Sequence, residues 1–323
     1  MKNISLTLIL WLSVTMFAVA QSISLNCKVF DTNSSKIPDN IIKTLTTDNM
    51  DQVWFATGDC FFGGNLVKFD GFDFKIYDST NSGMRDKFVT TIFVDDNNRK
   101  WIGTRYHGVY LYNDTTWVNY CPQNCGLTDV HVTAIAQDLN DVMWFATDNG
   151  LASFNGKNWA AYRTNNSKIP ENLVNALAVD KQNNKWVATN NGFAKFDGKE
   201  FTVYQKNNSE LPNNQVNDVY VDTKGTVWVV YWSGLIKIGD EKWTFYTSEN
   251  SGLQKFTDYK PCKDNQGVMW FGSGNGIIRW EGSKWNLYNP LNSCIPSFFI
   301  NKITVDSRNR KWFATNDGLL LIE

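Results

Sequence analysis

Seven tryptophans recur along the chain at a nearly constant interval, and this repeat constrains the fold more than any other feature. The intervals between them are 47, 43 and then 42 residues. A repeat of about 40–45 residues is typical of one four-stranded blade of a β-propeller. The repeated tryptophans are Trp54, Trp101, Trp144, Trp186, Trp228, Trp270 and Trp312.

The fourth unit displays the strands of one blade most clearly. It predicts strands at residues 174–179, 186–189, 193–196 and 201–204, separated by short polar turns. These segments are apolar on both faces, as expected when each sheet packs between two others. Asp197-Gly198 before the last strand predicts a type I′ hairpin turn, which needs φ > 0 at both central residues.

An aspartate precedes the first turn of every unit. One acidic residue per unit beside a turn is most simply an acceptor for the backbone N–H groups of that turn, and we expect no metal ring or catalytic role for it. The seven residues are Asp48, Asp95, Asp138, Asp180, Asp222, Asp264 and Asp306.

The two ends of the chain complement each other. The seventh unit stops at Glu323, after its third predicted strand, while residues 26–38 align without a gap with residues 158–170, which hold a fourth strand. Residues 25–30 should therefore add the outer strand to the last blade, and closure removes exposed sheet edges. The predicted fold is all-β: a seven-bladed β-propeller with four antiparallel strands per blade, closed by the N-terminal strand.

The first 20 residues have the pattern of an export signal. Lys2 precedes an apolar run from 4 to 18, and Ala18-Val19-Ala20 fits a cleavage site. We expect residues 1–20 to be a signal peptide and 21–323 a single propeller domain, periplasmic or extracellular. An uncleaved anchor is the alternative. We expect no membrane span after cleavage.

The charge pattern speaks against one class of partner. The formal net charge is −1, and no block of basic residues occurs. Binding to nucleic acid needs clustered Lys and Arg, so we expect no nucleic-acid partner. No spacing of residues indicates a metal site or a cofactor, and we expect neither.

The repeat also carries a recognisable motif. Trp144-Phe145-Ala146-Thr147-Asp148-Asn149-Gly150-Leu151 and its equivalents are followed by Phe-Asp-Gly, Trp-x-x-Tyr and Asn-Ser-x-Ile-Pro-x-Asn. This pattern resembles the two-component regulator propeller repeat over nearly all of residues 21–323. The resemblance implies a periplasmic sensor propeller that recognises oligosaccharides. The sequence shows one ring and no kinase segment, so we do not expect phosphotransfer to carry over.

Positions where the units disagree are candidates for binding. The turn between the second and third strands is usually short and polar, but three units place aromatic or charged residues there. Aromatic faces beside Arg and His suit a sugar or an aromatic ligand, although they could also cover wider gaps between blades. The candidates are Phe61 and Phe62 in unit 1, Arg105, Tyr106 and His107 in unit 2, and Tyr231 and Trp232 in unit 5.

The innermost strand changes character in units 5 to 7. A position held by Thr or Ala in the other units becomes Asp218, Lys260 and Lys302, and unit 6 adds Asp258 where the others have Val or Ile. The favoured interpretation is an Asp–Lys network around a wet channel, because buried charges need partners. The sharper alternative is a polar mouth that faces a ligand.

The histidines and cysteines leave several alternatives open. His107 and His131 could lie close together, but no third metal ligand has convincing spacing, which favours two ordinary surface histidines. In an oxidising compartment Cys121 could bridge Cys125, and Cys60 could bridge Cys294. Cys27 and Cys262 replace core residues and are expected to be buried.

Three functions are compatible with these features. The favoured one is a non-catalytic binding module for an oligosaccharide or an envelope protein. The second is a polysaccharide lyase, in which Tyr106 or His107 would abstract a proton and Arg105 would neutralise a uronate carboxylate. A glycosidase would have to use Asp218 and Asp258, whose neighbouring lysines disfavour a general acid. The third is a structural platform for protein partners.

Overall fold

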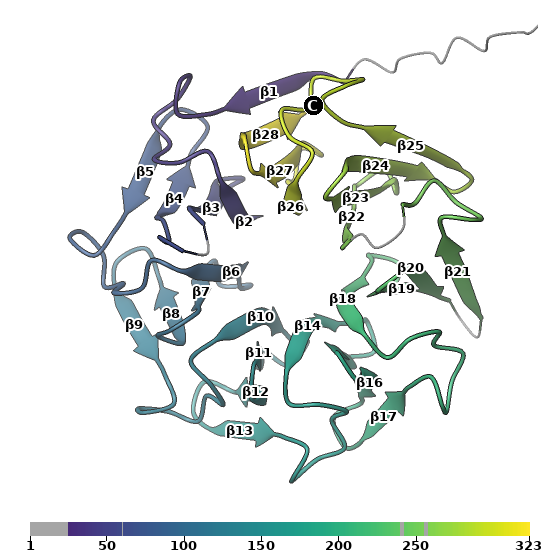
Figure 1. Cartoon of the computed structure of the whole chain (residues 1–323). Coiled ribbons are helices and arrows are strands. Elements are labelled where there is room, and N and C mark those ends of the chain that lie inside the picture. The colour runs from purple at the N-terminus through teal and green to yellow at the C-terminus, as the bar shows by residue number, and fades with distance from the viewer. Residues whose placement is uncertain (1–24, 60, 240–241, 255–257) are drawn as a thin grey trace, which may run out of the picture.

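The computed structural model describes residues 25–59, 61–239, 242–254 and 258–323, which form seven four-stranded antiparallel sheets. The sheets are arranged as blades around a central channel (Figure 1). The seven-bladed propeller predicted from the repeat is confirmed. No helix within these ranges is long and apolar enough to cross a membrane.

Each blade runs from an inner strand at the channel to an outer strand at the rim. Blade 1 has β2 (Ile42–Thr47), β3 (Val53–Thr57), β4 (Leu66–Phe69) and β5 (Phe74–Tyr77); blade 2 has β6 (Val89–Val94), β7 (Lys100–Thr104), β8 (Val109–Tyr112) and β9 (Trp117–Tyr120). Blade 3 has β10 (Val132–Gln137), β11 (Met143–Thr147), β12 (Gly150–Phe154) and β13 (Trp159–Tyr162); blade 4 has β14 (Val174–Val179), β15 (Lys185–Thr189), β16 (Gly192–Phe196) and β17 (Phe201–Tyr204). Blade 5 has β18 (Val216–Val221), β19 (Val227–Tyr231), β20 (Gly234–Ile238) and β21 (Trp243–Thr247); blade 6 has β22 (Lys260–Lys263), β23 (Met269–Ser273), β24 (Gly276–Glu281) and β25 (Lys284–Tyr288). Blade 7 has β26 (Ile300–Val305), β27 (Lys311–Thr315), β28 (Gly318–Ile322) and, from the other end of the chain, β1 (Cys27–Phe30).

The N-terminal strand closes the ring as predicted. β1 pairs antiparallel with β28, with Cys27 opposite Ile322, and lies beside it at the rim (Figure 1). A disulfide between Cys27 and Cys294 ties this strand to the connection that leads into blade 7. Two cysteine predictions were therefore wrong: Cys27 is not a free core residue, and Cys294 does not pair with Cys60. Cys60 itself lies outside the described residues.

The repeated aspartate and tryptophan are hydrogen-bonded to each other in six of the seven blades, and we call this pair a latch. Asp48 accepts the backbone N–H groups of Met50 and Gln52 (both 3.0 Å), which confirms its predicted role as a turn acceptor. Its second oxygen accepts the buried indole N–H of Trp54 at 3.0 Å. The same indole-to-aspartate bond recurs in blades 2, 3, 4, 6 and 7. A hydrogen bond to a buried charged acceptor fixes the first turn against the second strand.

Blade 5 is the exception among these latches. The indole N–H of Trp228 is buried and has no hydrogen-bond acceptor among the described residues. Asp222, the latch residue of this blade, instead accepts Lys263 Nζ of blade 6 at 2.6 Å. A lysine from the next blade also reaches Asp138, where Lys185 Nζ lies at 2.8 Å, but there the Trp144 bond is kept.

The hairpin after β16 differs in type from the prediction. Asp197 pairs with Glu200 through its N–H, so the two central residues are Gly198 and Lys199. Gly198 has φ +99°, and Lys199 is not among the residues with positive φ. This is the pattern of a type II′ turn, with glycine first, rather than type I′. Asp197 contributes by accepting the N–H groups of Lys199 and Glu200.

Side chains on the inner strands also join neighbouring blades. Thr133 Oγ1 donates to the Val174 carbonyl at 2.5 Å, and Asn175 Nδ2 donates to the Val216 carbonyl at 2.8 Å. Equivalent bonds link blades 2 and 3 and, across the closure, blades 7 and 1. Each donor is the second residue of its inner strand, at a β-bulge that turns its side chain towards the next blade.

Candidate functional site

One face of the ring carries both the turns between second and third strands and the connections between blades; we call it the connection face. In blade 4, for example, the N–H of Gly192 in such a turn donates to the carbonyl of Asn214 in the connection to blade 5, at 2.6 Å. The inner strands begin on this face. The opposite face, which carries the hairpins such as 70–73, is called the hairpin face.

A cavity of about 410 Å³ opens on the connection face between blades 6, 7 and 1, and we call it the mouth pocket. The residues that matter for its chemistry are Lys43, Asp258, Lys260, Asn275, Phe299 and Asn301. It adjoins the central channel, a cavity of about 550 Å³, because Lys43, Lys260 and Asn301 line both. Pockets that combine apolar surface with a few converging polar groups are the usual binding sites.

At the start of the inner strand of blade 6, the order of apolar and polar residues is the reverse of that in the other blades. Elsewhere the first residue is apolar and buried, as Val174 and Val216 are, and the second is polar. In blade 6 the order is Asp258 then Tyr259; Asp258 has 52% of its side chain exposed and Tyr259 is fully buried. Because neighbouring residues of a strand point to opposite faces, exchanging polar and apolar residues exchanges which one is buried. The inversion places a carboxylate in the mouth pocket.

This strand also lacks the bulge that is present in the other six inner strands. β22 pairs with β23 from Lys260 opposite Gly272 onwards without a shift of register. The Tyr259 hydroxyl donates to the Gln254 carbonyl at 2.9 Å, and its ring packs edge-on to Phe271. The buried Tyr259 side chain therefore holds the segment before β22 against the core, and the next residue, Lys260, lies at the channel wall.

Asp218, Asp258 and Lys260 form a charged triad where the mouth pocket meets the channel. Lys260 Nζ lies 2.8 Å from Asp258 Oδ2 and 3.7 Å from Asp218 Oδ2. The other oxygen of Asp218 accepts the N–H of Val219 at 2.8 Å. Burial alone would lower the pKa of Lys260, but the two carboxylates outweigh it and raise that pKa. The predicted Asp–Lys network around the channel is thus present.

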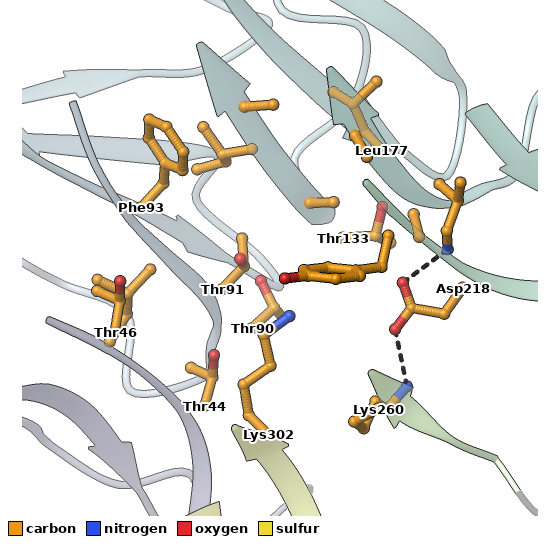
Figure 2. A pocket seen from close by; sticks show the side chains of 18 of the residues that line it. Thr44, Thr46, Thr90, Thr91, Phe93, Thr133, Leu177, Asp218, Lys260 and Lys302 are labelled. Atoms are coloured by element: carbon orange, nitrogen blue, oxygen red, sulfur yellow. Dashed lines mark hydrogen bonds and ion pairs between the residues drawn. The ribbon is translucent and has the colours of Figure 1, made fainter. Parts of the chain in front are cut away.

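The channel wall is asymmetric. Figure 2 shows Lys302 extending from β26 into the cavity, with Asp218 and Lys260 paired on one side of it. Thr44 and Thr91 line the side formed by blades 1 and 2. The small side chains of Ala134 and Ala176 take the same strand position in blades 3 and 4. Three of the predicted site residues, Asp218, Lys260 and Lys302, are therefore brought together, and all charges of this layer come from blades 5 to 7.

The predicted aromatic residues lie at different points around the connection face. Phe61 and Phe62 are highly exposed in the expanded turn of blade 1, where Asp59 Oδ1 accepts their N–H groups at 2.8 and 2.7 Å. Trp232 is partly exposed in blade 5. None of the three lines the mouth pocket. Their place in a binding site remains a prediction.

Tyr231 does not lie where the prediction needs it. Its side chain is 2% exposed and packs in the core between blades 4 and 5 with Phe193 and Val216 nearby. It takes the strand-end position that Thr189 holds in blade 4, where the side chain points inward. The expectation that Tyr231 is an exposed contact residue was wrong, because this end of the second strand is buried in every blade.

Arg105, Tyr106 and His107 form a second cluster in the turn of blade 2. All three are exposed, and the Arg105 guanidinium lies over the Tyr106 ring at 5.5 Å. His107 Nδ1 lies 3.2 Å from Oδ2 of the buried Asp86, and the same oxygen accepts the N–H of Tyr106 at 2.9 Å. Asp86 thus fixes both the turn and the imidazole. No pattern in the sequence indicated a role for Asp86.

The second histidine has its own acidic partner. His131 Nδ1 lies 2.7 Å from Asp148 Oδ2. The turn that holds His107 is bonded to the connection before His131 through Gly108 N–H and the Val130 carbonyl (2.9 Å). Within the described ranges, no three His, Cys, Asp or Glu side chains come together in a way that could hold a metal ion.

The three remaining described cysteines are free thiols. Cys262 is buried, as predicted, and burial raises its pKa to about 12. Cys121 and Cys125 do not form the bridge considered above. Cys125 Sγ instead donates to the Cys121 carbonyl, as Ser167 Oγ donates to the Arg163 carbonyl in the next connection. The thiol replaces a serine that closes the turn.

Sequence reasoning missed Lys43, Asn275, Phe299 and Asn301 of the mouth pocket. Lys43 could have been found, because it replaces the Thr or Asn that is usual at the second position of an inner strand. Phe299 precedes the inner strand of blade 7 just as Phe88 precedes that of blade 2. A phenylalanine at this position therefore did not set blade 7 apart in the sequence. Its position beside the cavity follows only from the ring geometry.

Comparisons with known proteins find similar solved structures. No protein-family model matches the chain, and no curated protein matches it. Among solved structures, the extracellular domain assigned to the hybrid two-component system BT3049 of B. thetaiotaomicron is 18% identical, with a TM-score of 0.79 over 93% of this chain and 41% of that one. The chain thus spans about two fifths of that sensor domain.

Two other similar structures have different roles. A streptogramin B lyase is 15% identical, with a TM-score of 0.75 over 94% of this chain and 98% of that chain. PorZ, a surface component of the type-IX secretion system of Porphyromonas gingivalis, is 14% identical, with a TM-score of 0.70 over 89% of this chain and 47% of that chain. Such low identities show a shared fold. The occurrence of this fold in the extracellular domain of a two-component system agrees with the resemblance of the repeat to the two-component regulator propeller.

Proposed function

We propose that this protein is an exported, non-catalytic propeller that binds an oligosaccharide at the mouth pocket, within a sensing or uptake system. The observation that carries the proposal is the composition of that pocket. Phe299 is 55% exposed there, beside Asn275 and the ion-paired Asp258 and Lys260. A sugar ring offers an apolar face that stacks on an aromatic side chain and hydroxyls that bond to amides and charges.

Two further observations support export and sensing. The Cys27–Cys294 disulfide suits an oxidising compartment, such as the periplasm or the extracellular space. The similarity in fold to an extracellular sensor domain agrees with such a location. Because fold does not fix function, the pocket carries the argument and the similarity is secondary.

Thermal unfolding of residues 21–323 with a panel of neutral and acidic oligosaccharides tests the proposal. A ligand that binds only the folded state raises the melting temperature. Phe299→Ala should abolish this shift. Phe72→Ala is the matched control, because Phe72 is 97% exposed on the hairpin face. Equal shifts in both variants would place binding elsewhere and contradict the proposal.

An envelope protein is the alternative partner. Phe61, Phe62 and Phe298 are exposed on the connection face, and exposed apolar surface is typical of protein contacts. If no oligosaccharide shifts the melting temperature, the protein should be cross-linked in the presence of envelope proteins. An envelope protein that cross-links to the unaltered protein but not to the Phe61→Ser/Phe62→Ser variant would favour a protein partner. It would also fit the structural platform considered from the sequence.

A lyase is the second candidate function, and the Asp86–His107 contact favours it. A carboxylate at Nδ1 leaves the other imidazole nitrogen as an acceptor for a proton, with Tyr106 and Arg105 beside it. Absorbance at 235 nm after incubation with polyuronates would detect unsaturated ends. Activity that vanishes in His107→Ala but persists in His131→Ala would replace the binding proposal with catalysis.

A further inference from the structure

The charges at the junction of the mouth pocket and channel do not balance. Three lysines, Lys43, Lys260 and Lys302, face two aspartates, Asp218 and Asp258. Both aspartates are within ion-pair distance of Lys260, and Asp218 also accepts the N–H of Val219. The carboxylates of the triad are therefore occupied by a single lysine.

Lys43 and Lys302 remain without a carboxylate within 4.0 Å among the described residues. Lys43 does act at longer range on Asp59: hydrogen bonds from Phe62 and Phe61 chiefly lower the pKa of Asp59, and the charge of Lys43 adds to this. Asp59 Oδ1, however, already accepts those two N–H groups. Lys302 extends into the channel, where the walls opposite it are neutral (Figure 2).

The two lysines lie on neighbouring strands. Lys43 is on β2 and Lys302 on β26, which are adjacent in the ring across its closure. Asn301, next to Lys302, holds these strands together by donating to the Ile42 carbonyl at 2.7 Å. Two cations fixed on adjacent strands beside a cavity attract an anion, and an anion that enters would supply the missing countercharge.

We infer that the oligosaccharide bound here is acidic, and that a uronate carboxylate is held by Lys43 and Lys302 where the mouth pocket opens into the channel. This rests on the proposed function, because it assigns the charge of the same ligand. Phe299 lies in the outer part of the site, so a sugar stacked there can place a neighbouring acidic residue at the lysines.

Isothermal titration with three probes tests the inference: tetragalacturonate, its methyl ester and neutral cellotetraose. The free acid should bind best, and Lys43→Gln and Lys302→Gln should each weaken it about tenfold or more, as expected for loss of a hydrogen bond to a charged group. Lys157→Gln, exposed in the blade 3 hairpin on the opposite face, should bind as the unaltered protein does. The unliganded melting temperature of the variants should be unchanged, because no ion pair is removed.

The outcomes separate this inference from the proposed function. Equal binding of the acid and its methyl ester, lost only in Phe299→Ala, would overturn the inference and leave oligosaccharide binding intact. Absence of binding by all three probes would overturn both. A carboxylate-bearing peptide is titrated afterwards as a fourth probe. Tighter binding of this peptide than of tetragalacturonate, with the same dependence on Lys43 and Lys302, would overturn the assignment to a sugar.

Discussion

The unpaired indole of blade 5 makes a sharp prediction about stability. We compare Trp228→Phe with Trp144→Phe, because each substitution removes the same atoms from a buried indole. Trp144 donates to Asp138 Oδ2 at 3.0 Å, whereas Trp228 has no acceptor among the described residues. Both indoles also have a lysine over the ring, Lys185 at 4.9 Å and Lys237 at 5.8 Å.

The expected difference follows from whether each indole N–H has an acceptor. The volume lost is the same at both sites, so the cost of the smaller side chain should nearly cancel in the comparison. Trp144→Phe additionally loses a bond to a charged acceptor, about 1.5–3 kcal/mol, while Trp228→Phe relieves a buried unsatisfied donor, about 1–3 kcal/mol. Trp144→Phe should therefore reduce the free energy of unfolding by at least about 2 kcal/mol more than Trp228→Phe.

Denaturant unfolding followed by circular dichroism at 25 °C measures this difference directly. The free energy of unfolding should fall with denaturant concentration at the same slope in both variants and in the unaltered protein. A shift in the midpoint then reports a change in stability. Equal destabilisation by the two substitutions, or a greater loss for Trp228→Phe, would refute the reasoning. It would mean that the bond between tryptophan and aspartate contributes nothing beyond packing.

Further predictions concern the closure, the latches and the inner strands. Reduction of Cys27–Cys294 should lower the free energy of unfolding by about 2–5 kcal/mol, and Cys27→Ala/Cys294→Ala should abolish any effect of reductant on denaturant midpoints. Burial opposes the charge of Asp138, but hydrogen bonds from Lys185 and Trp144 outweigh it and hold the pKa of this carboxyl below its ordinary value. The charged carboxylate therefore stabilises the folded protein fully at a pH above the pKa that Asp138 has in the unfolded chain. This stabilisation is lost as the pH falls through the lower pKa of the folded protein. The free energy of unfolding, measured between pH 6 and pH 2.5, should therefore depend less on pH in Asp138→Asn than in the unaltered protein. Thr133→Val should cost about 1 kcal/mol in thermal unfolding, because it removes the bond to the Val174 carbonyl; no loss would show that this bond between blades is neutral.

The sequence alone determined the number of blades, their strands and the way the ring closes. These features depend on local patterns that recur once per unit, such as the aspartate before the turn and the tryptophan of the second strand. A repeated unit cannot bury its two apolar faces by itself, so seven copies must stack on one another. The complementary ends of the chain then leave β1 only one place, beside β28.

Only the tertiary structure decided which deviating residues share a site. Lys43 and Asp258 are far apart in the sequence, and they meet in the mouth pocket because the ring brings blades 6, 7 and 1 together. The partner of Cys294 likewise depends on which strand lies at the closure. Tyr231 and Asp258 both depart from their repeats, yet one is buried and the other exposed. The physical reason is that the direction of a side chain follows from the register of its strand, and a local inversion such as that of blade 6 reverses it.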